Sequence, residues 1–321
     1  MKISLLSIYP DVQSFGLRTI SACLKKEGHD VDLFFLTREF RERFEEKTMN
    51  DLLKLTKNSD LVGISLMSNF WDNAIQITRK IKENYDIPVV WGGTHPTVKP
   101  DECLDHTDMV CIGEGEYAIL DFANAFDKLG KKIPLDIPNF WVKVDGKVYR
   151  NAVRSRIHNL DEVPYPARDL FYNKFPLMKN HGIKSFTAHR GCPHKCTYCF
   201  NHAYNKLTKG TGDMMRYRSV SSILREIKEV KDNYFIDRVL IDDDIFLLKP
   251  KGWLEEFAER YPEEIGIPLH CNVRPNMVSE RVGRLLRKSN CTHVYMGIEC
   301  GNNEIASKLL KRATKNEKII E

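Results

Sequence analysis

Long apolar runs are missing from this sequence of 321 residues, and no stretch approaches the ~20 residues that a membrane-spanning helix needs. Glycine and proline are also scarce, with 18 and 14 residues, which excludes collagen-like and low-complexity chains. The N-terminal apolar stretch carries one lysine and ends at Pro10, too soon for a signal peptide. We therefore expect a cytoplasmic protein that does not bind a membrane.

The chain has nine cysteines, an odd number that cannot all be paired in disulfides. In a reducing compartment an odd number points to ligation or catalysis rather than to disulfides. Charge is uneven: residues 1–150 carry 20 basic and 23 acidic groups, whereas residues 151–321 carry 29 and 21. The basic excess fits an anionic ligand or an ordinary solvated surface, and it is too diffuse to indicate nucleic acid.

The first 150 residues alternate short β-branched runs with amphipathic helical patterns. This alternation predicts an α/β domain with a doubly wound parallel sheet, whose ligands bind beyond the carboxyl ends of its strands. Asp145-Gly146 lies between two further alternating runs and predicts a hairpin. Prolines at 164 and 166 indicate an extended connector over residues 151–183. Residues 184–321 then contain four strand–helix units, the pattern of a partial parallel barrel.

The segment GCPHKCTYCF follows the first strand of this second domain and places Cys192, Cys196 and Cys199 in a C-x3-C-x2-C spacing. Three thiolates so close in sequence can hold one iron–sulfur cluster, and three ligands for four irons leave one iron open for reaction. A zinc site completed by His194 or His202 is the alternative.

This loop resembles that of radical S-adenosylmethionine (SAM) enzymes, which hold a 4Fe-4S cluster and bind SAM at its open iron. The segments LIDDDIF, CNVRP and GIECG resemble the same family at the ends of the later strands, with Cys300 in place of serine. Parallel barrels gather their chemistry at that rim. The SAM contacts that the resemblance implies are Tyr198, Asp243, Asp244, Arg274 and Glu299.

The first domain resembles the cobalamin-binding domain that often precedes such barrels. Ser65 and the Gly92-Gly93 pair are separated by the family's 26 residues, and GEGE contributes Glu114 and Gly115. The motif D-x-H-x-x-G keeps its frame from Asp11 to Gly16, but Gln13 replaces the histidine that would bind cobalt. An amide oxygen is a poor metal donor beside imidazole, so we expect cobalamin without a strong lower ligand from the protein.

The combined resemblance implies an enzyme that uses both cofactors, most often a methyltransferase acting on a small molecule at an unactivated carbon or phosphorus. The alternatives are a radical cyclase or rearrangement enzyme, a methylthiotransferase, and a non-catalytic cobalamin-binding fragment. A reducing electron donor such as flavodoxin or ferredoxin is implied as a partner.

The barrel is shorter than the family pattern, which has six strand–helix units where this chain has four. We therefore expect the strand at residues 294–298 to have one neighbour and an open backbone edge. An open edge is normally covered in soluble proteins. A missing segment or a partner chain would then have to close the barrel.

Overall fold

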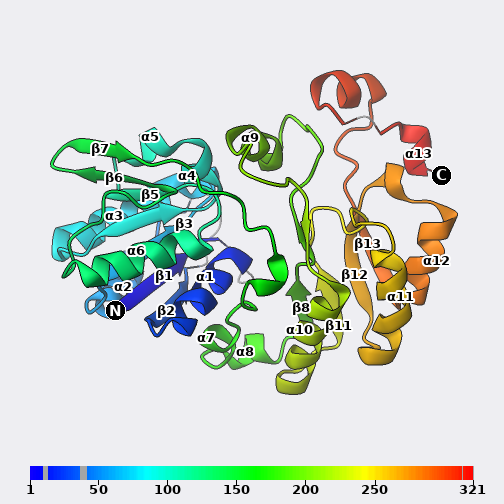
Figure 1. Ribbon diagram of the computed structural model, residues 1–321, viewed down its shortest axis with the longest axis horizontal. Coiled ribbons are helices and arrows are strands. Elements are labelled where there is room, and N and C mark those ends of the chain that lie inside the picture. Colours follow the sequence, from blue (N-terminus) through cyan, green and yellow to red (C-terminus); the bar gives the residue numbers. More distant parts are fainter. Residues whose placement is uncertain (10–13, 37–41, 313, 321) are drawn as a thin grey trace. The chain divides into compact units, whose positions relative to one another are not determined.

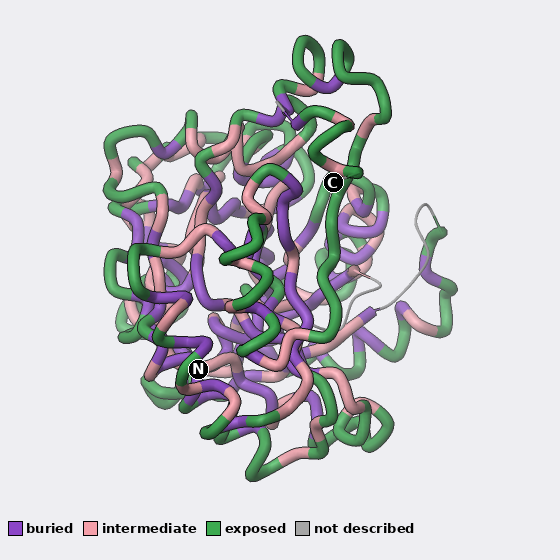
Figure 2. Tube along the Cα trace, turned by 90° about the vertical axis from the view of Figure 1, so that its right-hand side faces the viewer, coloured by how far each residue is buried: buried purple, intermediate pink, exposed green. Residues whose placement is uncertain are grey.

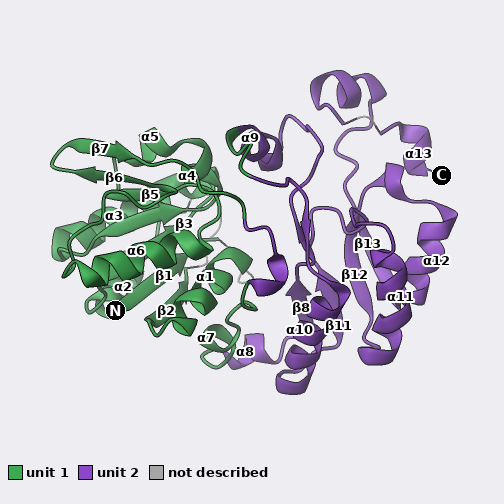
Figure 3. Ribbon diagram, viewed as in Figure 1, with its two compact units in different colours: residues 1–156, 163–174, 207–211 green, residues 157–162, 175–206, 212–321 purple. Residues whose placement is uncertain are grey.

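The computed structural model describes residues 1–9, 14–36, 42–312 and 314–320 (Figure 1). The chain divides into two compact units (Figure 3). Unit 1 comprises residues 1–156, 163–174 and 207–211, and unit 2 comprises residues 157–162, 175–206 and 212–321. The strands at residues 2–7, 61–65 and 109–111 in unit 1 and 269–273 in unit 2 are mostly buried, and Figure 2 colours the chain by burial. No helix in the described ranges is both long and apolar enough to cross a bilayer.

Unit 1 contains a seven-stranded sheet in the order β2-β1-β3-β4-β5-β6-β7. The first five strands in this order run parallel, and the last two form the predicted antiparallel hairpin around Asp145 and Gly146. Its strands are β1 (Lys2–Ser7), β2 (Asp30–Phe35), β3 (Leu61–Ser65), β4 (Val89–Gly92), β5 (Met109–Cys111), β6 (Phe140–Val144) and β7 (Lys147–Arg150). The register pairs Ser7 with Ser65 and Ser65 with Gly92, so the predicted cofactor residues lie at one edge of the sheet.

Helices cover both faces of this sheet, as in a doubly wound fold. Apolar residues of α2 and α3 share one core with the sheet, and those of α1 and α6 share the other. Gly28 follows α1 with a φ of +84°, the left-handed conformation that commonly ends a helix. The helices of unit 1 are α1 (Phe15–Lys26), α2 (Glu46–Thr56), α3 (Trp71–Asn84), α4 (Thr94–Val98), α5 (Pro100–Cys103), α6 (Glu116–Lys128) and α7 (Asp169–Tyr172).

Unit 2 contains a four-stranded parallel sheet in the order β13-β12-β11-β8 and a short antiparallel pair, β9 and β10. Its strands are β8 (Ile183–Phe186), β9 (His189–Arg190), β10 (Arg216–Tyr217), β11 (Arg238–Ile241), β12 (Leu269–Val273) and β13 (Cys291–Met296). Its helices are α8 (Pro176–Lys179), α9 (Phe200–Leu207), α10 (Val220–Asn233), α11 (Trp253–Glu264), α12 (Glu280–Lys288) and α13 (Asn316–Ile320).

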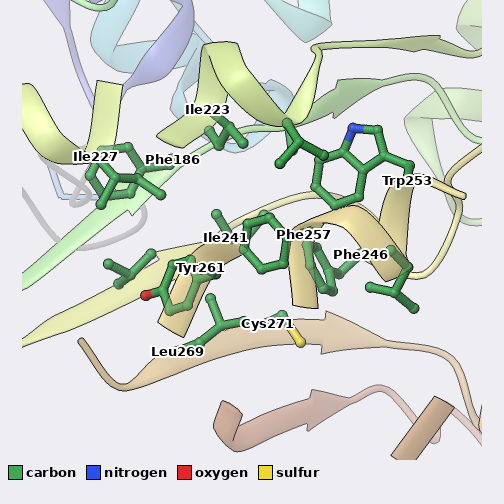
Figure 4. Close-up of a cluster of buried hydrophobic side chains, with 14 of the residues drawn as sticks. Phe186, Ile223, Ile227, Ile241, Phe246, Trp253, Phe257, Tyr261, Leu269 and Cys271 are labelled. Atoms are coloured by element: carbon green, nitrogen blue, oxygen red, sulfur yellow. The ribbon is translucent and has the colours of Figure 1, made fainter. Parts of the chain in front are cut away.

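Local sequence explains where two of these helices begin. Ser219 and Ser279 cap α10 and α12 by accepting a hydrogen bond from the backbone N–H three residues on. The apolar faces of α10 and α11 then pack on the sheet, where Phe257, Ile223 and Ile241 share one core (Figure 4). This core holds the strands at the fixed spacing that positions their carboxyl ends.

Strand β13 is an edge strand, with β12 as its one neighbour among the described residues. This confirms the predicted count of four strands and the partial barrel. Val294 and Tyr295 are about half exposed, and Ile298 just beyond the strand is exposed as well.

Candidate functional site

The cysteine loop connects β9 to α9, at the carboxyl end of the four-stranded sheet. Cys192 and Cys196 are buried, Cys199 is half-buried, and all three are free thiols. Burial raises the pKa of Cys192, and the nearby Asp244 carboxylate and the other two cysteines add to this shift. The three predicted ligands therefore lie in one loop, between β9 and α9.

Three free cysteines in one loop are the kind of donor set that an iron–sulfur cluster uses. In the described part of the chain, no three His, Cys, Asp or Glu side chains are arranged around one metal position. A zinc site would need four ligands around one ion. In an iron–sulfur cluster each thiolate binds a different iron, so the sulfurs need not converge on one point.

The path of the loop is fixed by backbone and side-chain contacts. Gly191 has a φ of +98°, and a Cβ there would lie 2.0 Å from the carbonyl oxygen of Met214. No other residue fits at that position. Asn205 on α9 donates a hydrogen bond of 2.8 Å to the carbonyl of Cys192. Both contacts fix the beginning of the loop, at Gly191 and Cys192.

Two arginines face the loop from later parts of the chain. Arg274 follows β12, is 4% exposed, and places Nη1 4.0 Å from the sulfur of Cys196. Arg312 lies 3.3 Å from the Tyr198 hydroxyl and 4.0 Å from a Glu299 oxygen. Burial lowers the pKa of His194, and both arginines lower it further. The two arginines therefore place positive charge beside the loop, which suits thiolate ligands.

The two predicted aspartates after β11 have different surroundings. Asp244 is exposed and accepts a hydrogen bond of 2.9 Å from Asn201. Asp243 is fully buried, and both of its oxygens are bonded within the chain, to backbone amides and to Lys249. Burial alone would raise the pKa of Asp243, but Lys249 and His189 hold it well below its ordinary value.

The segment at residues 309–312 also reaches the cysteine loop. Thr197 donates from its backbone N–H to the carbonyl of Leu310 at 3.1 Å and from its hydroxyl to the carbonyl of Leu309 at 2.9 Å. Sequence reasoning missed Arg312, because nothing in KLLKR distinguishes it from the end of an ordinary charged helix.

In unit 1, Ser65 and the diglycine meet at the carboxyl edge of the sheet. The Ser65 hydroxyl lies 2.8 Å from that of Tyr9, and a Cβ on Gly93 would lie 3.0 Å from the Ser65 oxygen. Burial raises the pKa of Tyr9 to about 12. Tyr9 was missed from sequence, because a tyrosine after a buried strand is common.

The other predicted cobalamin residues occupy different positions. Gly115 immediately precedes α6, and a Cβ there would contact Ile20. The backbone carbonyl of Glu114 accepts a hydrogen bond from Asn139. Gly16 lies in the first turn of α1, and Gln13 lies outside the described residues. The loops after β4 and β5 are joined by a hydrogen bond of 3.1 Å from the Gly113 N–H to Thr97.

The three cysteines of unit 1 lie within helices and a strand, away from the loops that would hold a cluster. Cys23, Cys103 and Cys111 lie in α1, α5 and β5, and each is buried. Burial raises the pKa of both Cys103 and Cys111 to about 12. Their positions in a helix or strand fit apolar packing.

Comparisons with known proteins agree with this geometry. The B12 binding domain family matches residues 1–123, and the radical SAM superfamily matches residues 187–321. An uncharacterized methyltransferase of Pyrococcus horikoshii is 28% identical over 306 residues, 93% of this chain and 63% of that protein. Cytidylyl-2-hydroxyethylphosphonate methyltransferase of Streptomyces wedmorensis is 25% identical over 357 residues, 94% of this chain and 64% of that protein.

One solved structure has the same fold over nearly the whole chain. It is the radical SAM methyltransferase TsrM of Kitasatospora setae with cobalamin and a [4Fe-4S] cluster bound, at 19% identity and a TM-score of 0.73. The match covers 99% of this chain and 64% of that one. The chain thus spans slightly less than two thirds of the length of these relatives.

Proposed function

We propose, from the premise that this chain joins a B12-binding domain to a radical SAM domain, that it is a cobalamin-dependent radical SAM methyltransferase acting on a small molecule. The observation that carries the proposal is the cysteine loop: three free thiols at the carboxyl end of a parallel sheet, with the buried Arg274 beside Cys196. We also propose that the protein lies in the cytoplasm and that a flavodoxin or ferredoxin supplies it with electrons.

When bound, the cluster and SAM supply one-electron cleavage of the cofactor, and cobalamin supplies a carrier for the methyl group. Cys192, Cys196 and Cys199 would hold three irons and leave the fourth open to SAM. Arg274 and Arg312 would balance the negative charge of the thiolates and of a carboxylate. Burial of Cys192 and Cys196 keeps water from the ligands on that side.

Tyr198, Asp244, Arg274 and Glu299 are our proposed SAM contacts. Tyr198 is half exposed and Glu299 keeps a partly exposed carboxylate, so both can receive a ligand. Asp243 is bonded at both oxygens within the chain and has a different role, argued below.

Ser65, Gly92 and Gly93 are the proposed centre of the cobalamin site. Their strand ends are adjacent, and two consecutive glycines let a bulky ligand approach the backbone. Gln13, Gly16, Glu114 and Gly115 complete the proposed set; of these, Gly16 lies in the first turn of α1, and Glu114 and Gly115 lie between β5 and α6.

Anaerobic reconstitution of the chain with iron, sulfide, cobalamin and SAM tests this proposal. Methyl transfer from SAM leaves S-adenosylhomocysteine, whereas SAM cleavage alone leaves 5′-deoxyadenosine. Both products are expected in the presence of substrate. Formation of deoxyadenosine alone would favour a cyclase or rearrangement enzyme, and a chain that binds neither iron nor cobalamin would refute the proposal.

A further inference from the structure

Three charged or polar side chains are buried together next to the cysteine loop. Lys249 Nζ lies 2.7 Å from Asp243 Oδ2 and 2.8 Å from His189 Nδ1, and His189 Nδ1 lies 2.9 Å from the same carboxylate oxygen. At most 2% of any of these side chains is exposed. Buried charges are costly unless they are paired and hydrogen-bonded, so this arrangement needs an explanation.

Lys249 and His189 both face the same carboxylate oxygen. The Lys249 ammonium has three N–H groups, and one of them donates to Asp243 Oδ2. His189 Nδ1 lies within hydrogen-bonding distance of both Lys249 Nζ and Asp243 Oδ2, and a proton on Nδ1 is donated to that oxygen. The rings of Phe246 and Trp253 lie 5.0 and 5.1 Å from Nζ and pack around the ammonium.

The other oxygen of Asp243 holds the backbone that leads into the cysteine loop. Asp243 Oδ1 accepts from the N–H of Ala188 at 2.7 Å and from the N–H of His189 at 3.1 Å. These residues lie just before Gly191 and Cys192. Because an unpartnered buried N–H is costly, this carboxylate fixes the start of the loop.

We propose that Asp243, Lys249 and His189 form a positioning network, in which Asp243 holds the cysteine loop through its backbone and touches no cofactor. Lys249 compensates the buried carboxylate, and His189 is held from both its backbone and its ring. The role in cluster assembly rests on the proposed function, whereas the hold on the loop does not.

Two double variants of the full chain separate the charge of the network from its hold on the loop. Asp243→Asn with Lys249→Met removes both charges but keeps an oxygen that can accept from the two amides. Asp243→Leu with Lys249→Met removes both charges and that acceptor. Neither variant leaves an unpaired buried charge, which is the usual reason for misfolding at such a site.

The readout is the rate at which iodoacetamide alkylates each cysteine of the metal-free chain, followed by mass spectrometry. We expect the Leu/Met variant to alkylate Cys192 and Cys196 roughly tenfold faster than wild type, because local opening becomes easier. The Asn/Met variant should stay within about twofold of wild type. Cys271, buried in β12 of the same unit, reports on the folding of that unit and should not change.

Equal loop rates in the two double variants would overturn the proposal. An increase at Cys271 as large as that at the loop would also overturn it, because the network would then support the whole unit. After reconstitution, the Leu/Met variant should hold less iron and show an altered electron paramagnetic resonance (EPR) spectrum. If wild type binds no cluster while the loop rates behave as expected, the proposed function fails and the positioning network stands.

Discussion

Arg274 places its guanidinium Nη1 4.0 Å from the Cys196 sulfur, although 78 residues separate the two in the chain. The strand order β13-β12-β11-β8 brings them together, because the loops after β8 and β12 leave the sheet at the same edge. Arg274 Nε has no hydrogen-bond partner among the described residues. A buried cation beside a proposed cluster ligand affects the charge that the cluster can accept.

Replacing Arg274 should therefore lower the reduction potential of the reconstituted cluster. A cluster becomes more negative on reduction, and a nearby cation stabilises that state. We expect Arg274→Met to shift the potential downward on the order of 60 mV, about tenfold in the one-electron equilibrium, and Arg274→Lys to shift it less. A redox titration followed by EPR measures this shift. A potential unchanged in Arg274→Met would show that the guanidinium does not act on the cluster.

The cysteines offer a test with internal controls. Cys192→Ala, Cys196→Ala and Cys199→Ala should each lose most of the bound iron, because a cluster with two protein ligands is poorly held. Cys103→Ala and Cys111→Ala, which replace buried thiols in unit 1, should keep wild-type iron content. Colorimetric iron and sulfide analysis of anaerobically reconstituted protein checks both groups. Iron loss in the Cys103→Ala or Cys111→Ala variant would indicate that unit 1 holds a second cluster.

Much of this arrangement was predictable from the sequence, and the exceptions have physical causes. Alternating runs predicted both sheets, and the C-x3-C-x2-C spacing predicted the loop, because these signals are local. Asp243 and Asp244 were treated alike, since a sequence does not show that Lys249 and His189 surround only the first. Arg312 and Tyr9 were missed because their partners lie far along the chain.

Tyr9 provides a prediction for alkaline pH. Its pKa is raised from 10 to about 12 in the folded protein, so the unfolded chain loses this proton first. The stability that the buried neutral phenol contributes is complete below pH 10 and is lost as pH rises toward 12. The loss amounts to about 2 to 3 kcal/mol at most. The free energy of unfolding, measured with denaturant between pH 9 and about 11.5, should fall less steeply with pH in Tyr9→Phe than in wild type. Identical pH dependence in the two proteins would show that Tyr9 ionises normally.

The hydrogen bond between Tyr9 and Ser65 predicts coupled effects on cobalamin binding. Ser65→Ala should weaken binding about tenfold, as expected for a lost hydrogen bond to a buried ligand group. Tyr9→Phe should weaken it less, because it removes only the partner that orients the Ser65 hydroxyl. The double variant should be no weaker than Ser65→Ala, since Tyr9 acts through that hydroxyl. Absorbance titration with cobalamin measures all three, and additive losses would contradict the coupling.

Arg312 links three groups around the proposed SAM site: the Tyr198 hydroxyl, the Glu299 carboxylate and the carbonyl of Gly297. Its side chain is 11% exposed, so removing it leaves these groups without their common donor. We expect Arg312→Met to weaken SAM binding to the reconstituted protein about tenfold, because Tyr198 and Glu299 would no longer be held in place. Lys308→Met is the matched control, since Lys308 is 77% exposed and pairs with Glu304 one helical turn earlier. Equilibrium dialysis with labelled SAM compares the two variants. If Arg312→Met binds SAM as tightly as Lys308→Met, then Tyr198 and Glu299 either do not contact SAM or are held by other parts of the chain. The iron content of Arg312→Met shows separately whether the cysteine loop still assembles a cluster.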